Sequence, residues 1–136
     1  MKIRKGKIKD ASLCLEIAKK DKAKHWEKSD FINSAKDNHA VFLVAEDNRK
    51  IVGYIVGFIV PTKRTEAMIH ETRVDRNERG KDIGTKLVDG LCKEFFKRGV
   101  KVIYAEIEPR LLKFYRDSCK FRISGKWLEV AKKRSS

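Results

Sequence analysis

The chain has 136 residues, of which 41% are hydrophobic and 38% charged, with 8 Gly and 2 Pro. That composition excludes collagen-like, low-complexity and wholly disordered proteins, and the length suits one domain with its own core. Lys and Arg total 33 against 19 Asp and Glu, a net charge of +14. Such an excess favours either polyanionic partners or a lysine-rich solvated surface. Because the basic residues are spread along the whole chain, we favour the solvated surface over nucleic-acid binding.

No segment predicts a membrane span, a secretion signal or a metal site. The longest apolar stretch, residues 51–60, contains two glycines and is too short to cross a bilayer. The first ten residues alternate charged and apolar side chains, unlike a signal peptide. The three cysteines, Cys14, Cys92 and Cys119, are odd in number and lack a metal-binding spacing. We therefore expect a cytoplasmic protein with reduced thiols and no metal, either a monomer or a homodimer.

The hydrophobic pattern predicts an α/β fold of the α+β type, in the order β-α-α-β-β-β-α-β-α-β. Alternating residues indicate strands, and apolar residues three or four apart indicate helices. Asp10 is expected to cap the first helix, and Ser29-Asp30 the second. The expected strands are residues 2–8, 41–45, 51–60, 66–74, 100–107 and 121–130, the last with a bend at Gly125. The expected helices are residues 11–18, 29–35, 83–98 and 109–119.

The most informative segment is a charged, glycine-containing loop between a strand and the long helix that begins at Ile83. N–H groups at a helix start lack backbone partners and the helix dipole adds positive charge, so this position favours phosphate or pyrophosphate. Gly80 and Gly84 let the backbone approach an anion, and Arg79 and Lys81 add charge. Walker A and GxGxxG patterns are absent. By itself the loop suits a plain helix entry equally well.

In its context this loop resembles that of the GNAT superfamily of acyl-CoA-dependent N-acetyltransferases. The family's pyrophosphate loop follows the pattern Q/R-x-x-G-x-G/A, and the matching residues are Arg79, Asp82 and Gly84. The segment Leu112-Lys113-Phe114-Tyr115 matches the family's segment at a tyrosine that protonates departing CoA. The order of elements extends the resemblance over nearly all of the chain. It implies a mixed, mostly antiparallel sheet flanked by helices, in one N-acetyltransferase domain covering residues 1–136.

The chain departs from the family pattern at three positions. Asp82 replaces the first glycine of the loop, which places a carboxylate where pyrophosphate should lie. Glu108 replaces the asparagine that commonly begins the segment before the tyrosine. Lys120-Phe121 replaces the usual Gly-Phe and comes one residue later. An aspartate at position 82 is explained if its side chain caps the helix that follows, or if Lys81 and Lys86 neutralise its negative charge.

The resemblance implies transfer of an acetyl group from acetyl-CoA to a primary amine by direct attack in a ternary complex. Tyr115 would donate a proton to the thiolate leaving group. Glu71 would take the proton of the amine, directly or through water. His70 would face away from Glu71 on a regular strand, although a bulge could reverse that.

The resemblance also implies a set of cofactor-binding residues. The backbone of three strand residues would bind the pantetheine arm, and one of their amides could stabilise the oxyanion. The loop and the helix start would bind pyrophosphate. The full cofactor-binding set is Thr72, Arg73, Val74, Arg79, Gly80, Lys81, Asp82, Ile83, Gly84, Thr85 and Glu108.

The acceptor is an amine-bearing small molecule, peptide or protein, and several observations bear on it. Four glutamates, at positions 66, 71, 106 and 108, are expected to gather near the strand ends and to favour a cationic amine. Trp26 falls in the region that often contacts the acceptor, although both Trp26 and Trp127 are expected to pack. A covalent route through Cys92 or Cys119 is disfavoured, since no histidine is near them in sequence.

Two alternatives to an enzyme remain. A non-catalytic acyl-CoA-binding regulatory domain would keep the same fold, and Asp82 and Glu108 favour it. A nucleic-acid-binding protein is supported by net charge alone and ranks last, because no RNP-type aromatic segment, helix-turn-helix pattern or basic stripe is present.

Overall fold

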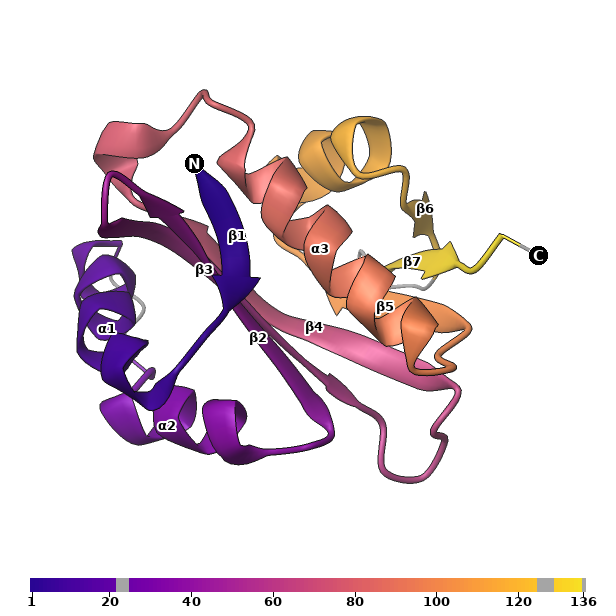
Figure 1. Cartoon of the computed structure of the whole chain (residues 1–136). Coiled ribbons are helices and arrows are strands. Elements are labelled where there is room, and N and C mark those ends of the chain that lie inside the picture. Colours follow the sequence, from indigo (N-terminus) through magenta and orange to yellow (C-terminus); the bar gives the residue numbers. More distant parts are fainter. Residues whose placement is uncertain (22–24, 125–128, 136) are drawn as a thin grey trace.

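The computed structural model describes residues 1–21, 25–124 and 129–135, and a seven-stranded sheet forms its centre (Figure 1). The strand order is β1-β2-β3-β4-β5-β7-β6, and every neighbouring pair is antiparallel except β4 and β5. The predicted mixed, mostly antiparallel sheet is therefore confirmed. The strands are β1 (Lys2–Lys5), β2 (Ala40–Asp47), β3 (Lys50–Ile59), β4 (Glu66–Val74), β5 (Val102–Glu106), β6 (Arg122–Ile123) and β7 (Glu129–Lys133).

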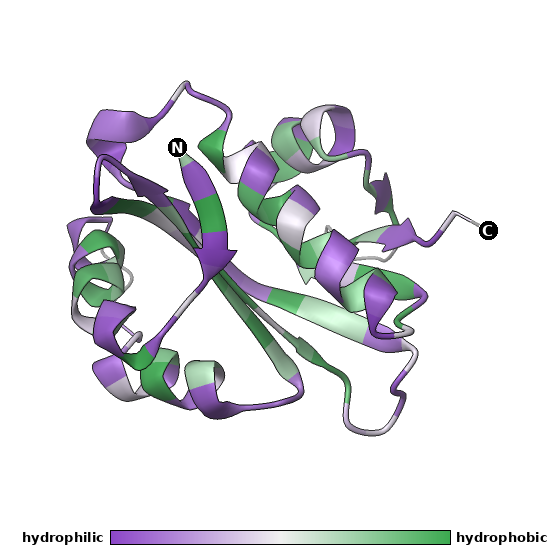
Figure 2. Ribbon diagram, viewed as in Figure 1, coloured by the Kyte–Doolittle hydropathy of each residue, from purple (hydrophilic) through white to green (hydrophobic). Residues whose placement is uncertain are grey.

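Helices cover the two faces of this sheet. The helices α1 (Ala11–Lys20) and α2 (Lys28–Lys36) pack on one face, and α3 (Ile83–Lys97) packs on the other. Hydrophobic residues concentrate along the central strands and alternate with hydrophilic residues along α3 (Figure 2). Within the described ranges, no helix is both long and apolar enough to cross a membrane.

The packing of α3 follows the sequence pattern closely. Its buried side chains recur three or four residues apart, as predicted, and are Ile83, Leu87, Val88, Leu91, Cys92 and Phe95. Two glycines of β3 allow the helix to approach the sheet. A Cβ at Gly57 would lie 3.0 Å from both Leu91 Cδ1 and Phe95 Cε2, and one at Gly53 would lie 3.2 Å from Leu87 Cδ1.

The N-terminal elements differ from the prediction in how they begin and end. The first strand ends at Lys5 rather than residue 8, because Ile8–Asp10 forms a 3-10 turn. Asp10 precedes α1 but does not cap it with its side chain. Its buried carboxylate instead accepts hydrogen bonds from the Lys7 backbone at 2.8 Å and from the Arg4 guanidinium at 2.9 and 3.0 Å. Charge-assisted hydrogen bonds from a guanidinium group stabilise a buried carboxylate more than a hydrogen bond to a backbone N–H at a helix start does.

The second helix begins one residue before the predicted cap. Its N-cap is Glu27, and Asp30 closes the first turn by accepting a hydrogen bond from the Glu27 backbone N–H at 2.8 Å. The Asp30 side chain therefore accepts a hydrogen bond at the helix start, as predicted. It does so from the third position of the helix and not from the N-cap position.

The C-terminal quarter departs further from the prediction. The expected helix at residues 109–119 is a 3-10 turn at Pro109–Leu111 followed by a π-helical turn at Phe114–Ser118. The expected strand at residues 121–130 is two strands, since the chain reverses so that β7 can pair with both β5 and β6. Gly125 and Trp127, which we expected to bend the strand and to pack, lie outside the described residues.

Strand β4 contains a β-bulge opposite β3. Val56 of β3 pairs with Glu71, but the next residue, Gly57, pairs with Ile69, so His70 is an extra residue in β4. Such a bulge bends its strand and increases the local twist. The parallel pairing of β4 with β5 runs from Glu66↔Val102 to Ile69↔Ala105, and the two strands diverge beyond it.

Candidate functional site

A cleft of about 500 Å³ opens where β4 and β5 diverge. The second half of β4 and the start of α3 form one side, and the segment from residue 105 to residue 118 forms the other. Because β4 pairs with β3 on one side here, alternate backbone N–H and C=O groups of residues 70–74 face the cleft. All but one of the predicted site residues line it: Glu71, Thr72, Arg73, Val74, Arg79, Gly80, Asp82, Ile83, Gly84, Thr85, Glu108 and Tyr115.

The exception is Lys81. Its side chain is exposed, and its ammonium group lies 2.6 Å from a carboxylate oxygen of Glu78. Lys81 is therefore not among the cleft-lining residues, although Glu78 is. Neutralisation of Asp82 by Lys81 and Lys86 has no support among the described residues, where Lys81 pairs with Glu78 and no ion pair joins either lysine to Asp82.

Two residues of the loop before α3 have left-handed backbone conformations. Gly80 has φ +87° and Asp82 has φ +61° with ψ +20°, both in the left-handed region. Aspartate is one of the few non-glycine residues that adopts this conformation at moderate cost, which explains how it can replace the glycine of the family pattern. Its side chain makes no capping hydrogen bond to α3 in the described part of the chain, so capping does not explain it.

The first turn of α3 closes one end of the cleft. Its N–H groups have no partners further back in the helix, and its 15 residues give the helix a full dipole. Gly84 also sets the distance to the opposite wall, because a Cβ there would lie 3.3 Å from the ring of Phe114.

Tyr115 lies across the cleft from β4, on the π-helical turn. Its side chain is 4% exposed and meets the rings of Phe114 and Phe121 edge-on. Its hydroxyl lies 3.4 Å from the Thr72 hydroxyl. Burial raises the pKa of Tyr115 to about 12, while the Thr72 hydrogen bond acts in the opposite direction. The phenol is therefore protonated at neutral pH and can donate its proton.

The bulge places His70 and Glu71 on the same face of the sheet. On the α1–α2 side, the centroid of the His70 ring lies 5.0 Å from that of Trp26, with the two rings tilted, and 6.0 Å from that of Phe58, which it meets edge-on. Glu71 pairs with Val56, whose side chain packs in the core under α1 and α2. The strand is not regular here, and of the two expected arrangements the structure has the one in which a bulge reverses the direction of His70, because the extra residue shifts the alternation by one.

Glu71 is engaged with its neighbour Arg73. Both of its carboxylate oxygens lie 3.2 Å from one guanidinium nitrogen, and both side chains are largely buried. An amine acting as substrate would meet a carboxylate that is already paired with a cation.

A cluster of arginines around Asp21 escaped the sequence analysis. Asp21 follows α1 and accepts hydrogen bonds from Arg73 at 3.2 Å, from Arg76 at 2.8 Å and from Arg79. Burial raises the pKa of Asp21, but the guanidinium groups of Arg76, Arg79 and Arg73 outweigh it and hold the pKa below its usual value. No sequence pattern links Asp21 to partners 52 to 58 residues away; the fold alone brings them together.

The glutamates and the tryptophan that were expected near the acceptor lie in different places. Three expected acidic residues line the cleft, at positions 71, 106 and 108, while Glu66 lies at the opposite end of β4, where it pairs with Lys63. Trp26 is buried against Phe31 and Tyr54, as expected of a packed side chain.

The three cysteine thiols lie in the core, where burial raises each pKa to about 12. A thiol of that pKa is not a nucleophile at neutral pH, so a covalent cysteine route has no support. The described residues include no group of three His, Cys, Asp or Glu side chains arranged to hold a metal ion.

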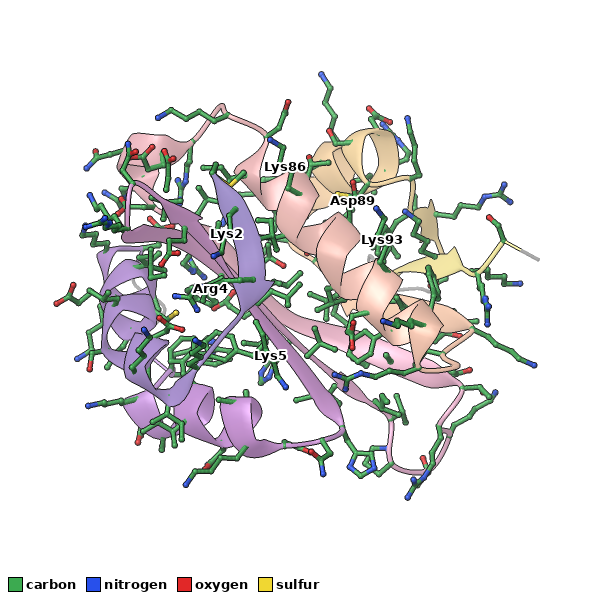
Figure 3. All side chains as sticks on the ribbon, in the orientation of Figure 1. Lys2, Arg4, Lys5, Lys86, Asp89 and Lys93 are labelled. Atoms are coloured by element: carbon green, nitrogen blue, oxygen red, sulfur yellow. The ribbon has the colours of Figure 1, made fainter. Side chains whose placement is uncertain are left out.

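The positive charge is distributed over the surface. Lys2 and Lys5 of β1 and Lys86 and Lys93 of α3 are exposed, and Asp89 lies between the two lysines of α3 (Figure 3). Interspersed charges of this kind suit a solvated face better than the continuous basic stripe of a nucleic-acid site.

Comparison of the sequence with known protein families finds the GNAT family that the motifs resemble. The sequence profile of the Acetyltransferase (GNAT) family matches residues 11–121. An L-2,4-diaminobutyric acid acetyltransferase from Marinococcus halophilus is 30% identical over 67 residues. That match covers 49% of this chain and 39% of the relative, so the chain spans less than half of the relative's length.

Solved structures share the fold over almost the whole chain. The ribosomal-protein-alanine N-acetyltransferase from Brucella melitensis superimposes with a TM-score of 0.82 at 20% identity, covering 98% of this chain and 100% of that one. An acetyltransferase from Salmonella typhimurium, determined with its cofactor acetyl-CoA, gives a TM-score of 0.83 at 19% identity, covering 100% and 95%.

The Asp21 cluster predicts a pH-dependent contribution to stability. Because its pKa is lowered in the folded state, Asp21 stabilises the fold above its unfolded pKa of about 3.9, and this is lost as pH falls through the folded value. Asp21→Asn should lower the free energy of unfolding at pH 7 by roughly 1–2 kcal/mol, a figure kept small because Arg76 and Arg79 are half exposed. Urea unfolding of both proteins at pH 7 and pH 3 measures this.

The matched control is Asp117→Asn, because Asp117 pairs with a single arginine, Arg116, and both side chains are exposed. No measurable change in stability is expected there. Equal loss in the two variants, or a gap between Asp21→Asn and wild type that stays constant with pH, would contradict the prediction.

Proposed function

Because the chain belongs to the acetyltransferase (GNAT) family, we propose that it transfers an acetyl group from acetyl-CoA to a primary amine by direct attack in a ternary complex. The observation that carries the proposal is the cleft between diverging β4 and β5, which has a helix N-terminus at one end and a protonated tyrosine on the opposite wall. An extended acyl-CoA needs both an anion site for pyrophosphate and a free strand edge for its arm.

The cofactor-binding residues divide by the part of acetyl-CoA that they contact. The free edge of β4 at Thr72, Arg73 and Val74 would hydrogen-bond the pantetheine arm as an added strand, and one of these amides would stabilise the oxyanion. The loop from Arg79 and the first turn of α3 through Thr85 would hold the pyrophosphate. Arg79 would then exchange its contact with Asp21 for one with phosphate.

The reaction needs two proton movements. The amine must lose a proton to attack the thioester carbonyl, and the tetrahedral intermediate then collapses by breaking the C–S bond. Tyr115 gives its phenolic proton to the sulfur as that bond breaks, so that CoA leaves as a thiol. The phenolate regains a proton from solvent.

The base is assigned to Glu71, acting on the amine through water. Both of its carboxylate oxygens already contact Arg73, which favours a water between the carboxylate and the amine over direct transfer. Arg73 also fixes the carboxylate in one position, and positioning contributes to rate in its own right.

The proposed acceptor is a small amine that carries positive charge. The relative from Marinococcus halophilus is named for 2,4-diaminobutyric acid, and carboxylates at positions 71, 106 and 108 line this cleft. A panel of 2,4-diaminobutyrate, spermidine, an aminoglycoside and a peptide with a free N-terminus, followed by thiol release from acetyl-CoA, tests the activity. The alternative of a non-catalytic acyl-CoA-binding domain is favoured by Asp82, and it predicts binding without thiol release.

Cofactor binding should depend on the nucleotide end of acetyl-CoA. At a ligand concentration of about 100 times Kd, acetyl-CoA should stabilise the fold by ~2.7 kcal/mol and raise Tm by roughly 5–10 °C. Acetyl-pantetheine, which lacks pyrophosphate and adenosine, should raise Tm far less at the same concentration. Thermal unfolding followed by circular dichroism measures both. Equal shifts would place the binding energy outside residues 79–85.

Replacing Tyr115 with Phe removes the proton donor but keeps the ring that packs against Phe114 and Phe121. Turnover should fall roughly tenfold to a thousandfold, with acetyl-CoA affinity changed little. Steady-state kinetics and calorimetric titration separate the two quantities. Tyr104→Phe is the control, since Tyr104 lies on β5 with its hydroxyl toward Glu66 at the far end of β4. Unchanged turnover in Tyr115→Phe, with chemistry rate-limiting, would exclude the proton-donor role.

Asp82→Gly should tighten acetyl-CoA binding by roughly threefold to tenfold, because a carboxylate beside two phosphate charges costs on the order of 1 kcal/mol in a wet site. Stability should change little, since glycine adopts φ +61° without strain but loses more chain entropy on folding. Calorimetric titration at low and high salt is the measurement, and the gain should shrink at high salt. Weaker binding by the glycine variant would mean that Asp82 orders the loop.

A further inference from the structure

We propose that the side chain of Thr72 is a positioning residue for Tyr115: its hydroxyl donates a hydrogen bond to the phenol oxygen and leaves the phenolic proton free to point at the sulfur of the departing CoA. This inference rests on the proposed function and deepens it. In the proposed function the backbone of Thr72 binds the pantetheine arm, and the present inference concerns its side chain.

The bulge at His70 is what brings the two hydroxyls together. Ala67 and Ile69 of β4 point into the core under α3, so regular alternation would send residue 72 to the other face. The extra residue reverses this alternation. Val74 consequently packs against the α3 core, Thr72 turns to the same side, and its Oγ1 lies 3.4 Å from the phenol oxygen.

The phenol of Tyr115 is buried, and its hydroxyl has Thr72 as a neighbour. Tyr115 is almost fully enclosed, between two phenylalanine rings. Among the described residues, Thr72 is the hydrogen-bond partner of the phenol oxygen. A distance of 3.4 Å is long for two hydroxyls, and catalytic hydrogen bonds in ligand-free sites are often long and shorten when substrate closes the site.

The direction of the hydrogen bond decides its effect. A phenol that donates to Thr72 would commit its proton to the threonine oxygen, and that proton could not then point at the sulfur of CoA. When Thr72 donates instead, the phenol keeps its proton available, and the bond strengthens as negative charge develops on the oxygen. Burial opposes that charge and raises the pKa of Tyr115 to about 12, whereas the Thr72 hydrogen bond lowers it. The threonine hydroxyl thus makes a buried phenol a more effective acid.

Other ionisable groups near the phenol do not provide this help. Glu71 on β4, Cys92 on α3 and Cys119 at the end of the π-helical turn all raise the pKa of Tyr115. Lys132 of β7 donates to the Cys119 carbonyl at 2.9 Å and is thereby engaged elsewhere. During the step one proton moves from the phenol to sulfur as the C–S bond breaks, and the proton of Thr72 stays on its own oxygen.

The test compares two substitutions of Thr72. Thr72→Val keeps the branched shape and the backbone groups that face the cleft but removes the hydroxyl. Thr72→Ser keeps the hydroxyl. With acetyl-CoA and the fastest amine of the panel, Thr72→Val should lower kcat about 5- to 20-fold, the effect of roughly one charge-stabilising hydrogen bond. The Kd for acetyl-CoA should change less than about threefold, and Thr72→Ser should recover most of kcat.

A double variant isolates the partnership. Thr72→Val combined with Tyr115→Phe should be no slower than Tyr115→Phe alone, because the hydroxyl then has no phenol to position. Thermal unfolding of every variant checks that the fold is kept, so that a fall in kcat reports on the site.

Three outcomes would overturn the proposal: wild-type kcat in Thr72→Val, a serine variant as slow as the valine variant, or additive losses in the double variant. If Tyr115→Phe is slow while Thr72→Val is not, the tyrosine keeps its role and Thr72 loses the one proposed here. If the wild-type protein binds acetyl-CoA but releases no thiol with any amine, the proposed function itself fails.

Discussion

The extra residue at His70 in β4 constrains most of what makes this molecule a candidate enzyme. It bends β4 away from β5 after four paired residues, so that a strand edge in the middle of a sheet becomes free to bind a ligand. It also reverses the alternation of side chains over the rest of the strand. Thr72 and Val74 therefore face α3 and Tyr115, while Glu71 and Arg73 face α1 and α2.

Electrostatics at the two ends of the cleft follow from this division. On the α1–α2 side, Arg73 links Glu71 to Asp21, and Asp21 in turn holds Arg76 and Arg79 of the loop. This network links the end of α1 to the loop before α3 through ion pairs. On the α3 side, burial keeps the phenol of Tyr115 protonated. One side of the cleft thus carries charged groups, and the other carries a protonated phenol.

The candidate site was predictable where its residues are neighbours in sequence. Arg79 to Thr85 form a continuous segment whose glycines and charges indicate an anion site, and all of them except Lys81 line the cleft. Lys81 could not be placed, because the sequence does not show that Glu78, three residues before it, would pair with its ammonium group. The aspartate at position 82 looked like a cap, but its left-handed backbone shows that conformation, not capping, accounts for its place in the loop.

The sequence by itself determined the order of the elements, the buried face of α3 and the helix-start loop, because each depends on periodicity or spacing within a few turns of chain. It also determined the family, through motifs that lie in short segments. Only the tertiary structure decided the bulge, the face to which each β4 side chain turns, the pairing of Asp21 with three arginines and the division of the last strand in two. Those features depend on which strand pairs with which and in what register. Register is fixed by contacts between residues far apart in the chain, which no local pattern contains.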